Sequence, residues 1–150
     1  WPIETGIMVE IPSAALLSPL LAREVDFFSI GTNDLTQYTL AAERGNPLLS
    51  DLADAFHPAV LRLIGEVAEA AHAAGKWVGV CGELGGDPLA APVLIGLGVD
   101  ELSLTPGGIP KTKSIVRSVD TTEARRLAEQ VTKAESAAEA RRLARQFLEG

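Results

Sequence analysis

Two carboxylates in this sequence stand where a divalent cation could be bound, each close behind an apolar segment. Glu10 ends the segment of residues 5–10, and Asp34 follows the segment of residues 27–30. If both segments are neighbouring parallel strands, their carboxyl ends lie ~4.8 Å apart and the carboxylates can share one cation. Two hard oxygen ligands, completed by oxygens of substrate and water, are typical of Mg²⁺ in phosphoryl transfer. Alternatively, Glu10 is a surface residue and Asp34 a helix cap, and spacing alone does not decide between these interpretations.

The residues around Asp34 could also bind an anion. Asn33 and the backbone N–H groups that open the following helix could hold a phosphate or a carboxylate, although helix capping would equally explain Asn33. Arg44 lies about three turns further on, where that helix is expected to end. Its forked guanidinium is a strong anion ligand, but an arginine at a helix C-terminus is also favoured by the helix dipole. From the residues alone, the structural interpretation of Arg44 is the simpler one.

Cys81 is the single thiol of the chain and ends the third predicted strand, beside Gly82. A lone cysteine on a strand is most often a small buried hydrophobic residue. Its expected position at the carboxyl edge of the sheet supports a second interpretation, in which the thiol donates or accepts a proton at carbon. His57 and His72 have no nucleophile, second histidine or cysteine near them in sequence, so we expect both to be structural.

Strands and helices alternate along residues 1–118, and this alternation must position the candidate residues. The predicted strands are residues 5–10, 27–30, 77–81 and 99–104, and the predicted helices are residues 12–21, 35–44, 58–74, 87–97 and 109–117. Pro19 is expected to break or kink the first helix, and Pro92 to disturb the helix that starts at residue 87. The first strand is expected to be buried on both faces, and residues 82–86 to form a loop. Four successive βα units imply a parallel sheet with right-handed crossovers, either an open doubly wound sheet or half of a (β/α)8 barrel.

Residues 119–150 differ in character, being rich in Ala, Glu and Arg and without strand patterns. Capping-box spacing at residues 120–123 and 136–139 predicts two helices. The run EARRLAxQ occurs at Glu123 and again at Glu139, which is too little repetition for a solenoid. A helical hairpin with solvated charged faces is the simpler interpretation, and a partner-binding surface is the alternative. We therefore divide the chain into residues 1–118 and a hairpin at residues 119–150.

Composition excludes several classes of function. With 150 residues and 47% apolar residues, the chain can form one globular domain with a core. A net charge of −7 argues against a nucleic-acid surface but leaves a small phosphorylated ligand possible. No segment is typical of a membrane span or an export signal, and one cysteine forms no internal disulfide, so a cytoplasmic location is expected.

Several long motifs occur in this chain in a fixed order. They are GIMVEIP at residues 6–12, DFFSIGTNDLTQY at residues 26–38, LAAERGN at residues 40–46, HPAVLR at residues 57–62 and VCGELGGD at residues 80–87. Together they resemble the phosphoenolpyruvate-binding domain of Enzyme I, the phosphoenolpyruvate–protein phosphotransferase of the bacterial sugar phosphotransferase system. The resemblance covers most of the chain up to about residue 117.

The resemblance assigns a role to each candidate residue. It implies that Glu10 and Asp34 bind Mg²⁺, that Asn33 and the backbone of Asp34 contact phosphoenolpyruvate, that Arg44 binds its phosphate, and that Cys81 protonates the enolate carbon as pyruvate forms. It also implies that the phosphoryl group passes to a histidine and then to the carrier protein HPr, which starts sugar uptake.

The resemblance also implies that the chain is incomplete. The phosphoacceptor histidine of the family lies in a separate N-terminal domain, and neither His57 nor His72 lies in a matching motif. A complete barrel needs ~250 residues, so the implied fold is the C-terminal half of a (β/α)8 TIM barrel followed by a helical hairpin. Exposed strand edges then predict marginal stability or association with another chain, as in a homodimer, and the chain alone is expected to be inactive.

Two other interpretations remain open. Pyruvate phosphate dikinase and phosphoenolpyruvate synthase resemble the chain around Thr-Asn-Asp and Cys-Gly-Glu, but Leu84, the run at residues 40–46 and the two-helix tail favour Enzyme I. A dimerisation or regulatory module without catalysis would also suit the helical tail. That alternative leaves the carboxylate pair and Cys81 unexplained.

Overall fold

A parallel β-sheet lies at the centre of the computed structural model, which describes residues 1–49 and 52–150. Its strands are β1 (Gly6–Val9), β2 (Phe27–Gly31), β3 (Trp77–Cys81) and β4 (Glu101–Leu102). They lie side by side in chain order, and every neighbouring pair is parallel. The predicted α/β class with a parallel sheet is therefore confirmed, although the fourth strand pairs over fewer residues than the predicted 99–104.

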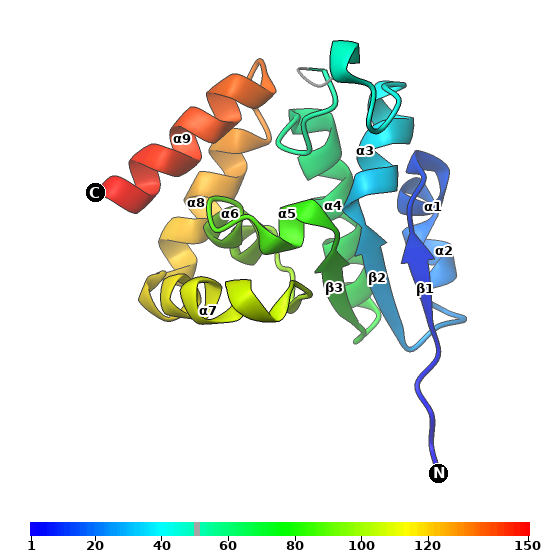
Figure 1. Cartoon of the computed structure of the whole chain (residues 1–150). Coiled ribbons are helices and arrows are strands. Elements are labelled where there is room, and N and C mark those ends of the chain that lie inside the picture. The colour runs from blue at the N-terminus through cyan, green and yellow to red at the C-terminus, as the bar shows by residue number, and fades with distance from the viewer. Residues whose placement is uncertain (50–51) are drawn as a thin grey trace.

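Helices connect the strands and form the C-terminal part of the chain (Figure 1). They are α1 (Pro12–Leu16), α2 (Ser18–Leu21), α3 (Thr32–Leu40), α4 (Pro58–Ala73), α5 (Glu83–Gly86), α6 (Ala91–Gly96), α7 (Ile109–Ser118), α8 (Thr121–Val131) and α9 (Ala137–Glu149), with 3₁₀ turns η1 (Pro47–Leu49) and η2 (Pro106–Gly108). The predicted break at Pro19 is confirmed, because the first helix divides at Leu17 and the proline lies in the first turn of α2. Within the described residues, no helix is both long and apolar enough to cross a membrane.

The two faces of the sheet are covered unequally. One face packs against α4 and buries its apolar side chains completely, namely Phe28, Ile30, Val78 and Val80. We call the opposite side the open face; it carries Met8, Phe27, Ser29, Trp77 and Cys81, and none of these side chains is fully buried. Met8 is 52% exposed, so the prediction that the first strand is buried on both faces is wrong.

Two aromatic rings are stacked on the open face. Phe27 and Trp77 occupy paired positions on β2 and β3, and their ring centroids lie 4.4 Å apart with an interplanar angle of 7°. The indole N–H of Trp77 donates a hydrogen bond to Glu4 Oε2 at 3.2 Å. This stack lies on the open face at the N-terminal ends of β2 and β3, away from the carboxyl ends of the strands.

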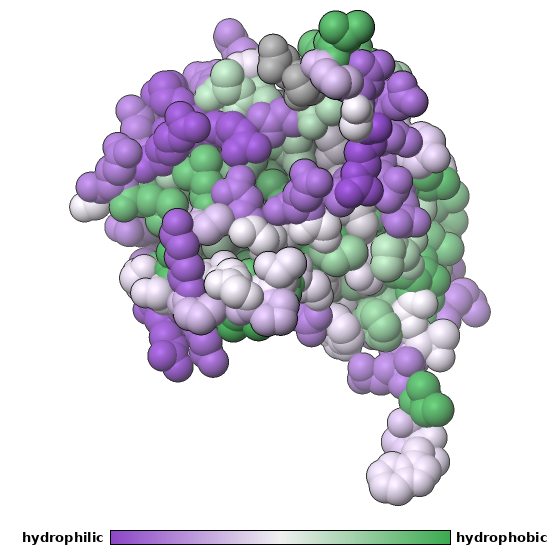
Figure 2. All heavy atoms as spheres, in the orientation of Figure 1, coloured by the Kyte–Doolittle hydropathy of each residue, from purple (hydrophilic) through white to green (hydrophobic). Residues whose placement is uncertain are grey.

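Apolar side chains are also exposed beside β1, at the edge of the sheet. Leu16, Leu17 and Leu20 of the α1–α2 region are each more than half exposed. Figure 2 shows hydrophobic residues on the side of the molecule formed by α1 and α2. The surface near β1 is therefore apolar on both the helical and the open side of the sheet.

Residues 82–97 differ from the prediction. The segment expected to be a loop forms α5, a single helical turn directly after β3. The helix expected from residue 87 begins only at Ala91, because the Asp87 carboxylate accepts a hydrogen bond from the Leu89 N–H at 2.9 Å and forms a turn. Pro92 lies in the first turn of α6, where its missing N–H removes no helical hydrogen bond.

The two predicted C-terminal helices are confirmed with their caps. Asp120 accepts hydrogen bonds from backbone N–H groups in the first turn of α8, and Ser136 accepts one from the Glu139 N–H at the start of α9. Helix α8 packs closely on α6, because any Cβ at Gly96 would overlap the backbone carbonyl of Ala124. The hairpin therefore lies directly against residues 1–118.

Candidate functional site

The carboxyl ends of three strands bring candidate residues to one edge of the sheet. The register pairs Val9 with Ile30 and Gly31 with Cys81, so Glu10, Gly31 and Cys81 follow one another across β1, β2 and β3. The Glu10 side chain lies across Gly31, since a Cβ built on this glycine would be 2.9 Å from Glu10 Oε1. The absence of a side chain at Gly31 leaves this space to the carboxylate.

Asp34 lies in the first turn of α3, which starts directly after Gly31. The structure therefore places Glu10 and Asp34 at adjacent strand ends, as predicted. Among the described residues, no group of three or more His, Cys, Asp or Glu side chains could hold a metal ion. A pair of carboxylates fits Mg²⁺, which keeps several waters and takes other oxygens from its substrate, better than it fits a metal enclosed by protein ligands.

The thiol of Cys81 is half-buried on the open face and is not in a disulfide. Its Sγ donates to the Ile30 carbonyl at 3.5 Å and accepts from Ser29 Oγ at 3.9 Å. The backbone carbonyl of Cys81 accepts a hydrogen bond from Thr32 Oγ1 at 2.7 Å, which ties β3 to the start of α3. The structure therefore brings Cys81 beside the strand ends that carry the two carboxylates.

Asn33 and Arg44 meet at α5. The Glu83 N–H donates to Asn33 Oδ1 at 3.1 Å, and the Glu83 carboxylate lies 3.7 Å from Arg44 Nη2. The prediction that Arg44 ends a helix is wrong, because α3 stops at Leu40 and Ala41 adopts a left-handed conformation with φ 51°. Arg44 therefore does not stand at a helix C-terminus, and the helix dipole does not explain an arginine at this position. Its guanidinium is exposed.

A pocket of about 1020 Å³ lies between the described part of the α3–α4 loop (residues 41–49 and 52–57), α5 and α9. Asn33 and Arg44 line it, whereas Glu10, Asp34 and Cys81 are not among its described lining residues. The charged residues that line it are Glu43, Arg44, Asp54, Glu83, Asp87, Arg141 and Arg145. The structure thus divides the predicted residues between this pocket and the adjoining edge of the sheet.

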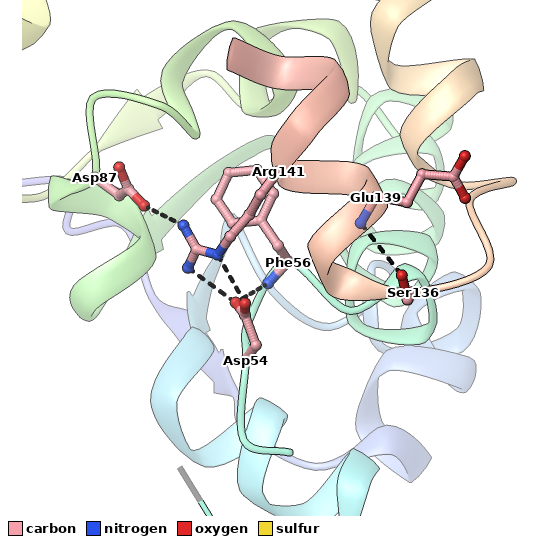
Figure 3. A network of polar contacts seen from close by, with 6 residues as sticks. All are labelled: Asp54, Phe56, Asp87, Ser136, Glu139 and Arg141. Atoms are coloured by element: carbon pink, nitrogen blue, oxygen red, sulfur yellow. Dashed lines mark hydrogen bonds and ion pairs between the residues drawn. The ribbon is translucent and has the colours of Figure 1, made fainter. Parts of the chain in front are cut away.

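Arg141 of α9 is a pocket residue that the sequence did not single out (Figure 3). Its Nε and Nη2 donate to the two carboxylate oxygens of Asp54 at 2.7 and 2.9 Å, and its Nη1 donates to Asp87 Oδ2 at 3.1 Å. The guanidinium also lies 4.3 Å from the ring centre of Phe56, which is fully buried. The sequence feature that could have identified Arg141 is its place next to the buried Ala140 and Ala144 of α9. A charged side chain at such a position needs hydrogen-bond or ion-pair partners.

This network shifts the titration of its members. Burial opposes ionisation of Asp54, but hydrogen bonds from Arg141 and from the Phe56 N–H, with the charge of Arg141, lower the pKa of Asp54 below its ordinary value of 3.8. Hydrogen bonding to Asp54 raises the pKa of Arg141 despite its burial. A lowered carboxylate pKa contributes stability above pH 3.8 that is lost as the pH falls through the folded-state pKa.

The two histidines have structural contacts, as predicted. His57 precedes α4, and its Nδ1 accepts a hydrogen bond from the Ala59 N–H at 3.2 Å. His72 Nε2 lies 2.9 Å from Asp100 Oδ2, which also accepts from the Val78 N–H. The His57 imidazole therefore caps the start of α4, and the His72 imidazole contacts the residue that precedes β4.

Residues 1–121 match the family described as PEP-utilising enzyme, PEP-binding domain. The chain belongs to the PEP-utilising enzyme family. Its residues are 51% identical over 97% of the chain to the phosphoenolpyruvate-protein phosphotransferase of Haemophilus influenzae, and 48% identical over 97% to that of Staphylococcus carnosus. The relative from Enterococcus faecalis is 52% identical over 87% of the chain. The resemblance predicted from the motifs is confirmed.

The chain spans about a quarter of the length of these curated relatives, 23 to 25%. The match to the PEP-binding domain ends at residue 121, whereas the similarity to the Haemophilus influenzae protein extends over 146 residues. Helix α9, which supplies Arg141 to the pocket, therefore lies outside the matched PEP-binding domain but within the region shared with a relative.

Proposed function

We propose that this chain is the C-terminal, phosphoenolpyruvate-binding part of a phosphoenolpyruvate–protein phosphotransferase. The observation that carries the proposal is the alignment of Glu10, Gly31 and Cys81 across three neighbouring strand ends, with Asp34 in the adjacent first turn of α3. The carboxyl edge of a parallel sheet is where enzymes of this architecture keep their sites. The names of the relatives support a protein phosphotransferase over a dikinase or a synthase.

The finer fold that we propose is the C-terminal half of a (β/α)8 barrel. A doubly wound sheet is covered by helices on both faces, whereas a barrel keeps its helices outside and fills its interior with strand side chains. The incomplete burial of the side chains on the open face and the chain order of the strands support the barrel. In the complete barrel, the remaining strands would cover Met8, Phe27 and Trp77 and add further ligands to the site.

Each candidate residue has a defined task in this mechanism. Glu10 and Asp34 would hold Mg²⁺, which would supply positive charge against the phosphate. Arg44 binds the phosphate oxygens, and Asn33 orients the substrate beside it. As the phosphorus–oxygen bond breaks and the phosphoryl group passes to a histidine of the N-terminal domain, Cys81 gives its proton to the enolate carbon and pyruvate forms.

We further propose the partners and location that this role requires. The phosphohistidine passes its phosphoryl group to the carrier protein HPr, so the pathway begins with phosphoenolpyruvate and leads to sugar uptake. The location that we propose for this reaction is the cytoplasm. The exposed apolar side chains of α1 and α2 are consistent with assembly of the complete protein as a homodimer.

We use the term complete enzyme for a full-length phosphotransferase that carries this chain as its C-terminal part. In the complete enzyme, we expect phosphoenolpyruvate binding to depend on both Mg²⁺ and Arg44. Calorimetric titration with and without Mg²⁺ measures it. Arg44→Ala should weaken binding about tenfold to a hundredfold, because charge-assisted hydrogen bonds to the phosphate are lost. The exposed Arg23 provides a control, and Arg23→Ala should leave the affinity unchanged. Equal affinity with and without metal would contradict the proposal.

Gly31→Ala should weaken Mg²⁺-dependent binding with little loss of stability. Gly31 has φ −82°, which any residue can adopt, but a Cβ would lie 2.7 Å from Glu10 Cγ and push the carboxylate aside. Gly79→Ala is the matched control on β3, because a Cβ there meets no atom closer than 3.5 Å. Urea unfolding and calorimetric titration of both variants test this prediction, and equal effects on binding would count against a ligand role for Glu10.

A further inference from the structure

Arg141 joins two walls of the pocket that come from different parts of the chain (Figure 3). One wall is the α3–α4 loop, which it holds through both carboxylate oxygens of Asp54. The other wall is α5, which is followed directly by Asp87, the acceptor of a hydrogen bond from Nη1. The guanidinium thus fixes the two walls relative to each other from α9.

One of these walls carries a candidate substrate ligand, and the other contacts a second one, Asn33 of α3. The α3–α4 loop carries Arg44, whose backbone N–H is held by Gln37 Oε1 at 2.8 Å. Helix α5 starts with Glu83, whose N–H donates to Asn33 Oδ1 and whose carboxylate lies near the Arg44 guanidinium. A change in the separation of the two walls would therefore move the Arg44 guanidinium relative to Glu83, which contacts the Asn33 side chain.

The described part of the α3–α4 loop is braced between Asp54 and Arg44. The Leu49 N–H donates to the Asn46 carbonyl, and the Ala53 N–H donates to the Leu49 carbonyl, both at 3.0 Å. These hydrogen bonds connect the held end of the loop at Asp54 to the segment that follows Arg44. A displacement of Asp54 is thus transmitted along the loop.

Three of the five N–H groups of Arg141 already donate to carboxylates of the protein. These groups are on Nε, Nη1 and Nη2, and one face of the guanidinium packs on the buried Phe56 ring. Its side chain is only 31% exposed, so this double ion pair is less screened by solvent than a surface pair. The geometry is that of a residue that acts through its neighbours.

We infer that Arg141 is a positioning residue for the substrate's phosphate group: it sets the separation of the α3–α4 loop from α5 and thereby places Arg44 opposite Asn33. This inference rests on the proposed function, because it requires Arg44 to bind phosphate. It makes the C-terminal hairpin a contributor to substrate affinity, although α9 lies beyond the matched PEP-binding domain.

Removing the guanidinium has two physical consequences. Asp54 and Asp87 lose the guanidinium that neutralises both of them, and the two negative charges on different walls then favour separation of the walls. A lysine at position 141 keeps the positive charge, but one ammonium group cannot reproduce the fork that contacts both carboxylates. Arg141→Lys therefore separates the contribution of geometry from that of charge.

The test compares two ligands that differ by the phosphate group. In the complete enzyme with Mg²⁺, Arg141→Ala should raise the Kd for phosphoenolpyruvate about tenfold and leave the Kd for pyruvate within about twofold. Arg141→Lys, which is the milder change for folding, should raise the Kd for phosphoenolpyruvate by about threefold or more. Arg142→Ala is the matched control and should leave both affinities unchanged, because the hydrogen bonds of Arg142 within the described residues go to Glu139 and Gln146 of its own helix.

A double variant shows whether Arg141 acts through Arg44. In the Arg44→Ala background, Arg141→Ala should cause no further loss of phosphoenolpyruvate affinity, since the residue it positions is absent. Additive losses, or equal losses for phosphoenolpyruvate and pyruvate, would overturn the inference. If Arg44→Ala weakens binding and Arg141→Ala does not, the inference fails alone; if Arg44→Ala has no effect, the ligand assignment in the proposed function fails with it.

Discussion

Glu10→Gln or Asp34→Asn should abolish Mg²⁺-dependent phosphoryl transfer by the complete enzyme while leaving its fold intact. Each amide is nearly the same size as the carboxylate it replaces but cannot neutralise a divalent cation. Metal ions contribute several kcal/mol to such transition states, so we expect the rate of pyruvate formation to fall about a thousandfold, or roughly 4 kcal/mol. The metal dependence should weaken in parallel.

Both variants can be compared with Glu66→Gln, which changes an exposed carboxylate on the outer face of α4. The control should transfer phosphoryl groups at the parental rate and with the parental Mg²⁺ requirement. Circular dichroism and urea unfolding of all variants would establish that the fold is retained. Parental activity in either Glu10→Gln or Asp34→Asn would remove that residue from the metal site.

Cys81→Ala should block turnover without a comparable loss of binding. The thiol lies at the same edge of the sheet as Glu10, and proton transfer by a positioned side chain contributes about 10²- to 10⁴-fold to a rate. We therefore expect pyruvate formation to slow by that factor, whereas the calorimetric Kd for phosphoenolpyruvate stays within about twofold, because alanine removes only the sulfur of a half-buried side chain.

Ser29→Ala offers a matched control for the cysteine. It removes the Oγ contact to Sγ at 3.9 Å but keeps the thiol and its donation to the Ile30 carbonyl. We expect it to retain most of the turnover. A Cys81→Ala enzyme that loses affinity as much as rate would instead indicate that the cysteine shapes the site rather than donating a proton.

The elements that the sequence predicted well are those with local causes. The interruption of the first helix follows from Pro19, and the starts of α8 and α9 follow from Asp120 and Ser136, whose side chains accept hydrogen bonds from the next turn. The bounds of β3 were predicted without error because Gly75 and Gly82, both with positive φ, mark the segments on either side. The adjacency of Glu10 and Asp34 likewise followed from the strand order.

The errors concern features that depend on distant parts of the chain. Exposure of Met8 cannot be read from an apolar run, because a strand inside a barrel and a strand in a doubly wound sheet have the same pattern. The position of Arg44 depends on where α3 stops, and Ala41 carries no sequence signal for a left-handed residue. Arg141 belongs to a charged run that repeats in α8, and its place on the buried stripe of α9 does not name its partners Asp54 and Asp87, which come from distant parts of the chain.

The stacked pair on the open face gives the protein an intrinsic optical reporter. The chain has two tryptophans: Trp1 is fully exposed, whereas Trp77 is half-buried against Phe27. Any polypeptide that covers the open face would remove the Trp77 indole from water and shift its fluorescence emission to shorter wavelength. With Trp1→Phe, the remaining emission comes from Trp77 alone, so closure of a barrel around this sheet can be followed in real time without an attached dye.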